Sequence, residues 1–189
     1  MDELEKEKRA GISWGDLADV ATLREQLGDR YQVPGWGMGV VLFSFVAKAV
    51  IKELGPQKGE ALLKEALIEF GHARGKRIAG IVKDLGRPLT LKNWITYGDM
   101  DPKNMSPKPA VEDGDFIMRT GNCVVWAAAA EFGVSQYSQI FCRYADDAIL
   151  EGYNPEIKLV KNIRYQTGSD HCLFRYIAKE SKNPQEEIK

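Results

Sequence analysis

One long helical segment constrains the fold of this chain more than any other feature. The sequence predicts a helix over residues 57–85, with Gly55-Pro56 before it and Gly86 and Pro88 after it. Proline is tolerated at the start of a helix, and glycine is typical just past its end. The apolar residues of the segment recur at helical spacing, and they are Leu62, Leu63, Ala66, Leu67, Phe70, Ile78, Ile81, Val82 and Leu85.

Three glycines interrupt this helix, at Gly71, Gly75 and Gly80. Each costs about 1 kcal/mol of helix stability relative to alanine, so we expect another backbone to pack closely against this helix. A shorter helix is predicted over residues 40–54, after an interruption by the glycine-rich stretch 34–39. Residues 1–31 are predicted to form a polar helical arm.

The C-terminal half mixes helix and strand patterns. A long surface loop is expected over residues 98–115, a strand over 116–120, and buried helices over 123–132 and 138–152. Two further strands, 157–165 and 171–177, are predicted to form a hairpin, and residues 179–189 a flexible polar tail. With 189 residues, the chain fits a single domain of the α/β (α+β) class, with a cysteine-containing core over 116–177 and a helical layer on a small antiparallel sheet.

Charge and composition exclude several kinds of partner. The chain has 26 Lys and Arg against 27 Asp and Glu, a net charge near −1, which argues against a nucleic-acid-binding protein. Its apolar run over residues 40–46 is too short to span a membrane, and no signal peptide is recognised at the N-terminus. We therefore expect a cytoplasmic protein, and the glycines of helix 57–85 favour a homodimer.

The candidate reactive residues are three cysteines, Cys123, Cys142 and Cys172. Cys123 stands where a strand meets a helix, and the positive end of that helix favours a thiolate. Asp146 follows Cys142 by four residues, so both side chains share one helical face and could act as nucleophile and proton carrier. The alternatives are buried structural thiols and a set of ligands for zinc or iron, since an odd number of cysteines forms no closed disulfide framework.

An ordered series of short motifs resembles a known family. The motifs are Asn122-Cys123, Glu131-Phe132-Gly133-Val134, Phe141-Cys142, Asp146, Gly152-Tyr153-Asn154-Pro155-Glu156-Ile157 and Thr167-Gly168-Ser169-Asp170-His171-Cys172-Leu173-Phe174. Together, over residues 119–176, they resemble the L-2-amino-thiazoline-4-carboxylic acid hydrolase family. The resemblance implies an α/β fold similar to 4-vinyl-reductase and TRAPP-type domains, and ring opening of a cyclic isothiourea to N-carbamoyl-cysteine.

Such a reaction needs a nucleophile at the central carbon, a proton for the leaving sulfur and stabilisation of the intermediate. We expect Cys142 or Cys123 to attack as a thiolate, or to hold a metal-bound water, with Asp146 moving the proton. Cys172 would be a third ligand or would line the pocket, and Arg119 would pair with a substrate carboxylate. No cofactor is implied unless the cysteines bind zinc or iron. The alternative from another class is a non-catalytic sensor domain that binds a small molecule or a metal.

Overall fold

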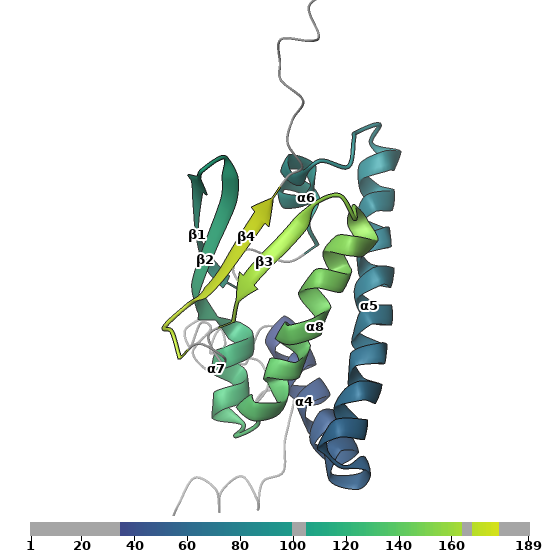
Figure 1. Ribbon diagram of the computed structural model, residues 1–189, viewed down its shortest axis with the longest axis vertical. Helices are drawn as coiled ribbons and strands as arrows, with labels where there is room; N and C mark the ends of the chain where they lie inside the picture. Colours follow the sequence, from purple (N-terminus) through teal and green to yellow (C-terminus); the bar gives the residue numbers. More distant parts are fainter. Residues whose placement is uncertain (1–34, 100–104, 164–167, 178–189) are drawn as a thin grey trace, which may run out of the picture. The chain divides into compact units, whose positions relative to one another are not determined.

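The computed structural model describes residues 35–99, 105–163 and 168–177 (Figure 1). The chain divides into two compact units, Met1–Val33 and Pro34–Lys189, and the described residues belong to the second. The predicted arm at 1–31 and tail at 179–189 lie outside them, so the single-domain assignment stays a prediction. None of the described helices is long and apolar enough to cross a membrane.

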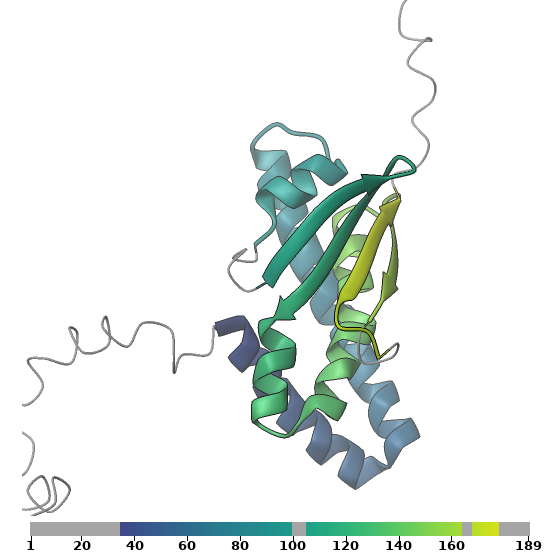
Figure 2. The same cartoon turned by 90° about the vertical axis from the view of Figure 1, so that its left-hand side faces the viewer.

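The described residues of this unit form five helices and four strands, which confirms a helical layer on a small antiparallel sheet. The helices are α4 (Gly35–Leu54), α5 (Pro56–Asp84), α6 (Leu91–Tyr97), α7 (Val124–Glu131) and α8 (Ser135–Tyr153). The strands are β1 (Met105–Glu112), β2 (Asp115–Cys123), β3 (Lys158–Asn162) and β4 (Cys172–Ile177). Figure 2 shows the sheet in front of α5 and α8.

The four strands are all antiparallel to their neighbours, in the order β1-β2-β4-β3. Side chains alternate between the two faces of a strand, so the register decides which of them face the helices. Phe116 and Met118 of β2 lie opposite Tyr176 and Phe174 of β4 and form the inner face. Their sequence neighbours point to the outer face.

Helices α5 and α8 pack closely against each other along a seam in which Gly71 and Gly75 of α5 meet Ala148 and Ile149 of α8. This seam leaves no room for additional atoms at the two glycines. A methyl group at Gly71 would lie 2.5 Å from the Ala148 side chain, and one at Gly75 would lie 2.0 Å from the Ile149 carbonyl oxygen. The close packing predicted for the glycines is therefore confirmed at these two positions. At Gly80 nothing lies within 4 Å of the added atom, so that glycine has no such packing role.

The ends of α5 agree closely with the prediction. Pro56 begins the helix, and Gly86 follows it with a φ of 66°, a conformation that favours glycine. The backbone N–H groups of Gly86 and Arg87 donate to the carbonyls of Lys83 and Val82, which closes the last turn. The buried stripe is narrower than predicted, because Leu62 and Phe70 are exposed.

Two sequence predictions are wrong. The stretch 98–115 is not a loop, because residues 105–112 form the edge strand β1, which pairs with β2 through the two-residue turn at Asp113 and Gly114. Pro107 and Pro109 are compatible with an edge strand, which needs ladder hydrogen bonds on one side only. The glycine-rich stretch is not an interruption over residues 35–39, because α4 already begins at Gly35.

The early start of α4 has a packing reason. Its buried residues recur every three or four positions, and they are Gly37, Val40, Val41, Ser44 and Ala47.

Helix α6 was not predicted at all. It begins after Thr90, whose side chain accepts a hydrogen bond from the backbone N–H of Asn93 and caps the helix.

Candidate functional site

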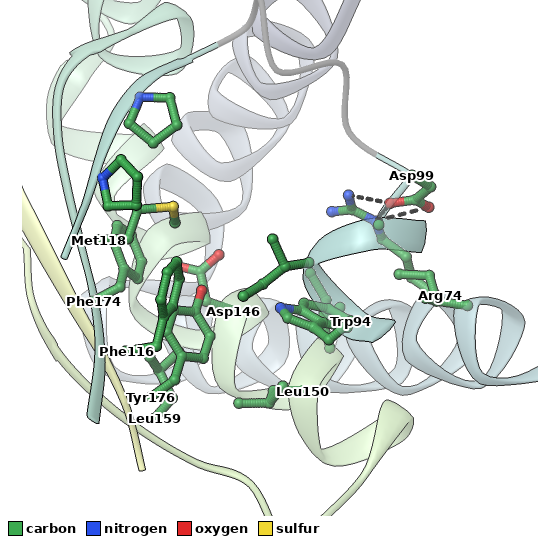
Figure 3. A pocket seen from close by; sticks show the side chains of 16 residues that line it. Arg74, Trp94, Asp99, Phe116, Met118, Asp146, Leu150, Leu159, Phe174 and Tyr176 are labelled. Atoms are coloured by element: carbon green, nitrogen blue, oxygen red, sulfur yellow. Dashed lines mark hydrogen bonds and ion pairs between the residues drawn. The ribbon is translucent and has the colours of Figure 1, made fainter. Parts of the chain in front are cut away.

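A cavity of about 330 Å³ lies between the inner face of the sheet and the helices (Figure 3). The sheet contributes Pro107, Pro109, Phe116, Met118, Leu159, Phe174 and Tyr176 to its wall. The helical side contributes Arg74, Ile78, Trp94, Ile95, Gly98, Asp99, Asp146, Ile149 and Leu150. The wall is therefore largely apolar and aromatic, with three charged side chains, and its volume suits a compact small molecule.

Asp146 on α8 is the charged side chain of the cavity wall that points toward the aromatic residues of the sheet (Figure 3). Its side chain keeps 30% of its accessible surface. Burial raises the pKa of Asp146 from 3.8 to about 6, and the nearby charge of Asp147 raises it further, while Lys161 and Arg74 act in the opposite direction. The carboxyl group is therefore ionised at neutral pH but takes up a proton easily, as a proton carrier must.

Lys161 lies near Asp146 but directs its hydrogen bonds to other groups. The Lys161 ammonium donates to the backbone oxygens of Cys142 and Arg143, at 2.9 and 3.0 Å, and to the Asp147 carboxylate at 2.6 Å. Its distance to the Asp146 carboxylate is 3.9 Å. An ammonium has three N–H groups, and these three closer partners use all of them. Lys161 thus anchors β3 to the middle of α8 and acts on Asp146 only through its charge.

Arg74 and Asp99 form the second charged feature of the wall. The Nε atom of Arg74 donates to both Asp99 oxygens, at 2.9 and 3.2 Å, and a terminal nitrogen donates at 2.5 Å. The guanidinium also lies 4.6 Å from the centre of the Trp36 ring. Figure 3 shows this pair to one side, apart from Asp146, which points toward the aromatic residues of the sheet.

The three cysteines lie within range of one another's charge. The pKa of Cys142 is raised well above its ordinary value, first by burial and then by the charges of Asp146, Cys123 and Cys172. The Cys142 thiol therefore stays protonated at neutral pH, which is unfavourable for a resting thiolate. Cys123 is the N-cap residue of α7, at the predicted strand–helix junction.

The thiols adjoin the cavity rather than forming its described wall, which includes Asp146 but no cysteine. Cys172 is buried on β4 and pairs with Thr120 of β2. The Thr120 hydroxyl is fully buried and has no hydrogen-bond partner among the described residues, so this corner holds a polar group that sequence reasoning missed.

Arg119 is not brought to this site. Its neighbours in sequence, Met118 and Thr120, belong to the inner face, so alternation directs Arg119 outward. Its guanidinium pairs instead with Glu112, at 2.8 Å on the outer face of β1. A molecule in the cavity would not contact Arg119.

Metal binding finds no support in the part of the chain that the structure describes. No three His, Cys, Asp or Glu side chains in residues 35–99, 105–163 and 168–177 are arranged to hold a metal ion. The cysteine-ligated zinc or iron site considered from the sequence therefore lacks a ligand set there. Within these residues, the cavity and the partly buried Asp146 carboxylate in its wall form the candidate site.

Fold and site together define an α+β domain with a largely apolar cavity between sheet and helices, and a carboxylate of raised pKa in its wall. The family model described as L-2-amino-thiazoline-4-carboxylic acid hydrolase matches residues 38–176, well over half of the chain. The chain belongs to this family, and the resemblance seen in its motifs is confirmed. No match was found among curated proteins or among solved structures.

Proposed function

We propose that this protein is a hydrolase that opens a small cyclic isothiourea or related amidine in its cavity, with Asp146 as the proton carrier. The observation that supports the proposal is the carboxylate of Asp146, with a pKa of about 6, in an apolar cavity of a chain from this hydrolase family. A small-molecule substrate is part of the proposal, and so is the cytoplasmic location expected from the sequence.

The proposed reaction begins with water and the ionised Asp146. The carboxylate accepts a proton from the water as the water oxygen bonds to the central carbon of the ring, and the electron pair of the carbon–nitrogen double bond moves to nitrogen, which gives a tetrahedral intermediate. The hydroxyl proton of this intermediate passes to that nitrogen as the urea carbonyl forms. The carbon–sulfur bond then breaks, its electron pair stays on sulfur, and protonated Asp146 returns the proton to that sulfur. The products are a urea group and a free thiol, so one water is consumed and Asp146 ends as it began.

A covalent route through a cysteine is the second form of the proposal. Cys142 would attack the central carbon while Asp146, four residues further along the same helical face, takes the thiol proton. The ring carbon–sulfur bond then breaks, Asp146 gives the proton to that sulfur, and a water hydrolyses the covalent intermediate to the urea and the free Cys142 thiol. The raised pKa of Cys142 disfavours this route, because the thiol enters it protonated. Cys123 and Cys172 would then tune the local charge next to Asp146.

The test is turnover of 2-amino-thiazoline and its 4-carboxylate, followed by mass spectrometry of the ring-opened product. Asp146→Asn should lower kcat at least about 100-fold, the usual contribution of a proton carrier. Glu151→Gln is the matched control, because Glu151 lies on the same helix, pairs with His72 at 3.1 Å on the surface and lies outside the described cavity wall. Its variant should keep most of the activity.

Single serine variants at Cys123, Cys142 and Cys172 separate the two routes. The water route predicts that each keeps activity within about tenfold, whereas loss of all turnover at one position would support the covalent route. A wild-type protein that binds these compounds but hydrolyses none would contradict the proposal and favour the non-catalytic binding domain.

A further inference from the structure

The charges of the cavity wall bear on which substrate it accepts. Asp99 and Asp146 are carboxylates, and Arg74 is the cation among the described lining residues. Arg74 is already engaged by Asp99 through three short contacts, the shortest at 2.5 Å. Arg77 also pairs with Asp99, at 3.4 Å, but it is largely exposed and lies outside the described lining. Within that lining two carboxylates stand against one cation, so it carries an excess negative charge.

Lys161 is a further nearby cation, and its charge partly offsets that of Asp146. Lys161 gives its three N–H groups to two backbone oxygens and to Asp147. It lies outside the described cavity wall. A substrate carboxylate would therefore meet the field of Asp146 without a new hydrogen bond from Lys161, and bringing a second anion beside a buried carboxylate is costly.

The aromatic residues of the wall favour a ligand that carries both a positive charge and an apolar group. Trp94 from the helical side and Tyr176 from the sheet each pack against another aromatic ring, Tyr153 at 5.1 Å and Phe116 at 5.8 Å between ring centres. Together with Phe116 and Phe174 they give the cavity an aromatic lining. Aromatic faces attract cations and bury apolar substituents.

We propose that the substrate is a cation, a protonated cyclic isothiourea or amidine whose ring carries an apolar group in place of a carboxylate. The protonated nitrogens would pair with the Asp146 carboxylate, and the apolar group would pack on Trp94 and Phe116. This inference rests on the proposed function and refines it, since the compound in the family's name is a carboxylic acid.

The test is calorimetric titration of the wild-type protein with four related ring compounds. They are 2-amino-4-phenyl-thiazoline, 2-amino-thiazoline, 2-amino-thiazoline-4-carboxylate and the neutral 4-phenyl-thiazolidin-2-one. The phenyl cation should bind at least tenfold more tightly than the carboxylate and than the neutral ring. In Asp146→Asn the preference for the cation over the neutral ring should disappear, while Glu151→Gln, at an exposed carboxylate of the same helix, should retain it.

The outcomes of the two proposals are distinguishable, because binding and turnover are measured separately. Tightest binding of the carboxylate, or equal binding of all four probes, would overturn the inference whether or not any compound is hydrolysed. Tight binding of the phenyl cation without hydrolysis of any probe would support the inference on the ligand and contradict the proposed hydrolase function. The wild-type titrations decide between these outcomes even if the Asp146 variant does not fold.

Discussion

The two sides of α8 differ sharply in how they pack. Toward α5, its Ala148 and Ile149 meet Gly71 and Gly75 so closely that not even a methyl group fits. Toward the sheet, the same helix leaves a cavity of about 330 Å³ and places a carboxylate, Asp146, in its wall. We infer that the close packing of α8 on α5 fixes the position of α8 along the cavity. The partly buried charge of Asp146 is tolerated there because this packing already holds the helix in place.

The largest effect should come from filling the seam. In Gly75→Ala the new methyl group would lie 2.0 Å from the Ile149 oxygen and 2.7 Å from the Tyr153 nitrogen, so the helices must separate. We expect a loss of more than about 3 kcal/mol in the free energy of unfolding, measured by urea denaturation. Gly80→Ala on the same helix is the control, and it should gain up to about 1 kcal/mol. Equal changes in the free energy of unfolding for the two variants would contradict the close packing of α5 on α8 at Gly75.

The next largest effect concerns the stability contribution of Asp146 in the cavity wall, and it depends on pH. Because the pKa of Asp146 is raised from 3.8 to about 6, the folded protein binds this proton more tightly than the unfolded chain. Wild-type stability therefore falls as the pH rises from about 4 to about 6, and at higher pH the ionised group costs up to about 3 kcal/mol. Asp146→Asn should be more stable than wild type at pH 8, and the difference should shrink below pH 6. A difference independent of pH would contradict the raised pKa.

A smaller effect is expected at the polar edge of the seam. Glu60 of α5 accepts a hydrogen bond of 2.7 Å from the Tyr144 hydroxyl and pairs with Arg143 of α8. The bond from Tyr144 and the charge of Arg143 lower the pKa of Glu60, so its contribution is present at neutral pH and is lost as the pH falls. Glu60→Gln should cost about 1 kcal/mol at pH 7, because the pair is about one-third exposed. Thermal unfolding at pH 7 and pH 3 should show this difference narrowing.

The smallest effect is expected on the outer face of the sheet. Arg119→Met removes an ion pair with Glu112 in which both side chains are partly exposed, and such pairs contribute about 0.5 kcal/mol. Ligand affinity and activity should not change, since Arg119 points away from the cavity. A loss of affinity above fivefold in titration calorimetry would instead assign Arg119 to the site, as the sequence first suggested.

Local signals in the sequence were sufficient for four of the five described helices, all except α6. The proline and glycine punctuation placed α5 nearly to the residue, and the four-residue spacing put Cys142 and Asp146 on one face. The edge strand β1 was missed because Pro107 and Pro109 are typical of loops as well as of sheet edges. Asp113-Gly114 was the available signal, since this pair is typical of two-residue hairpins.

The site was harder to predict because its partners are far apart in sequence. Lys161 lies 18 and 19 residues from the carbonyls it contacts, and Arg74 lies 25 residues from Asp99. No local pattern relates such positions. The outward direction of Arg119 could have been inferred from the alternation of β2, once its apolar residues Phe116 and Met118 were assigned to the inner face.

The prolines of β1 also affect how the protein behaves at high concentration. A proline fits an edge strand where its missing N–H would point away from the neighbouring strand, so at Pro107 and Pro109 the open edge lacks two hydrogen-bond donors. The other edge, β3, is only five residues long and carries Lys158 and Lys161. Neither edge is a good template for a strand from another molecule, which protects this small sheet against aggregation.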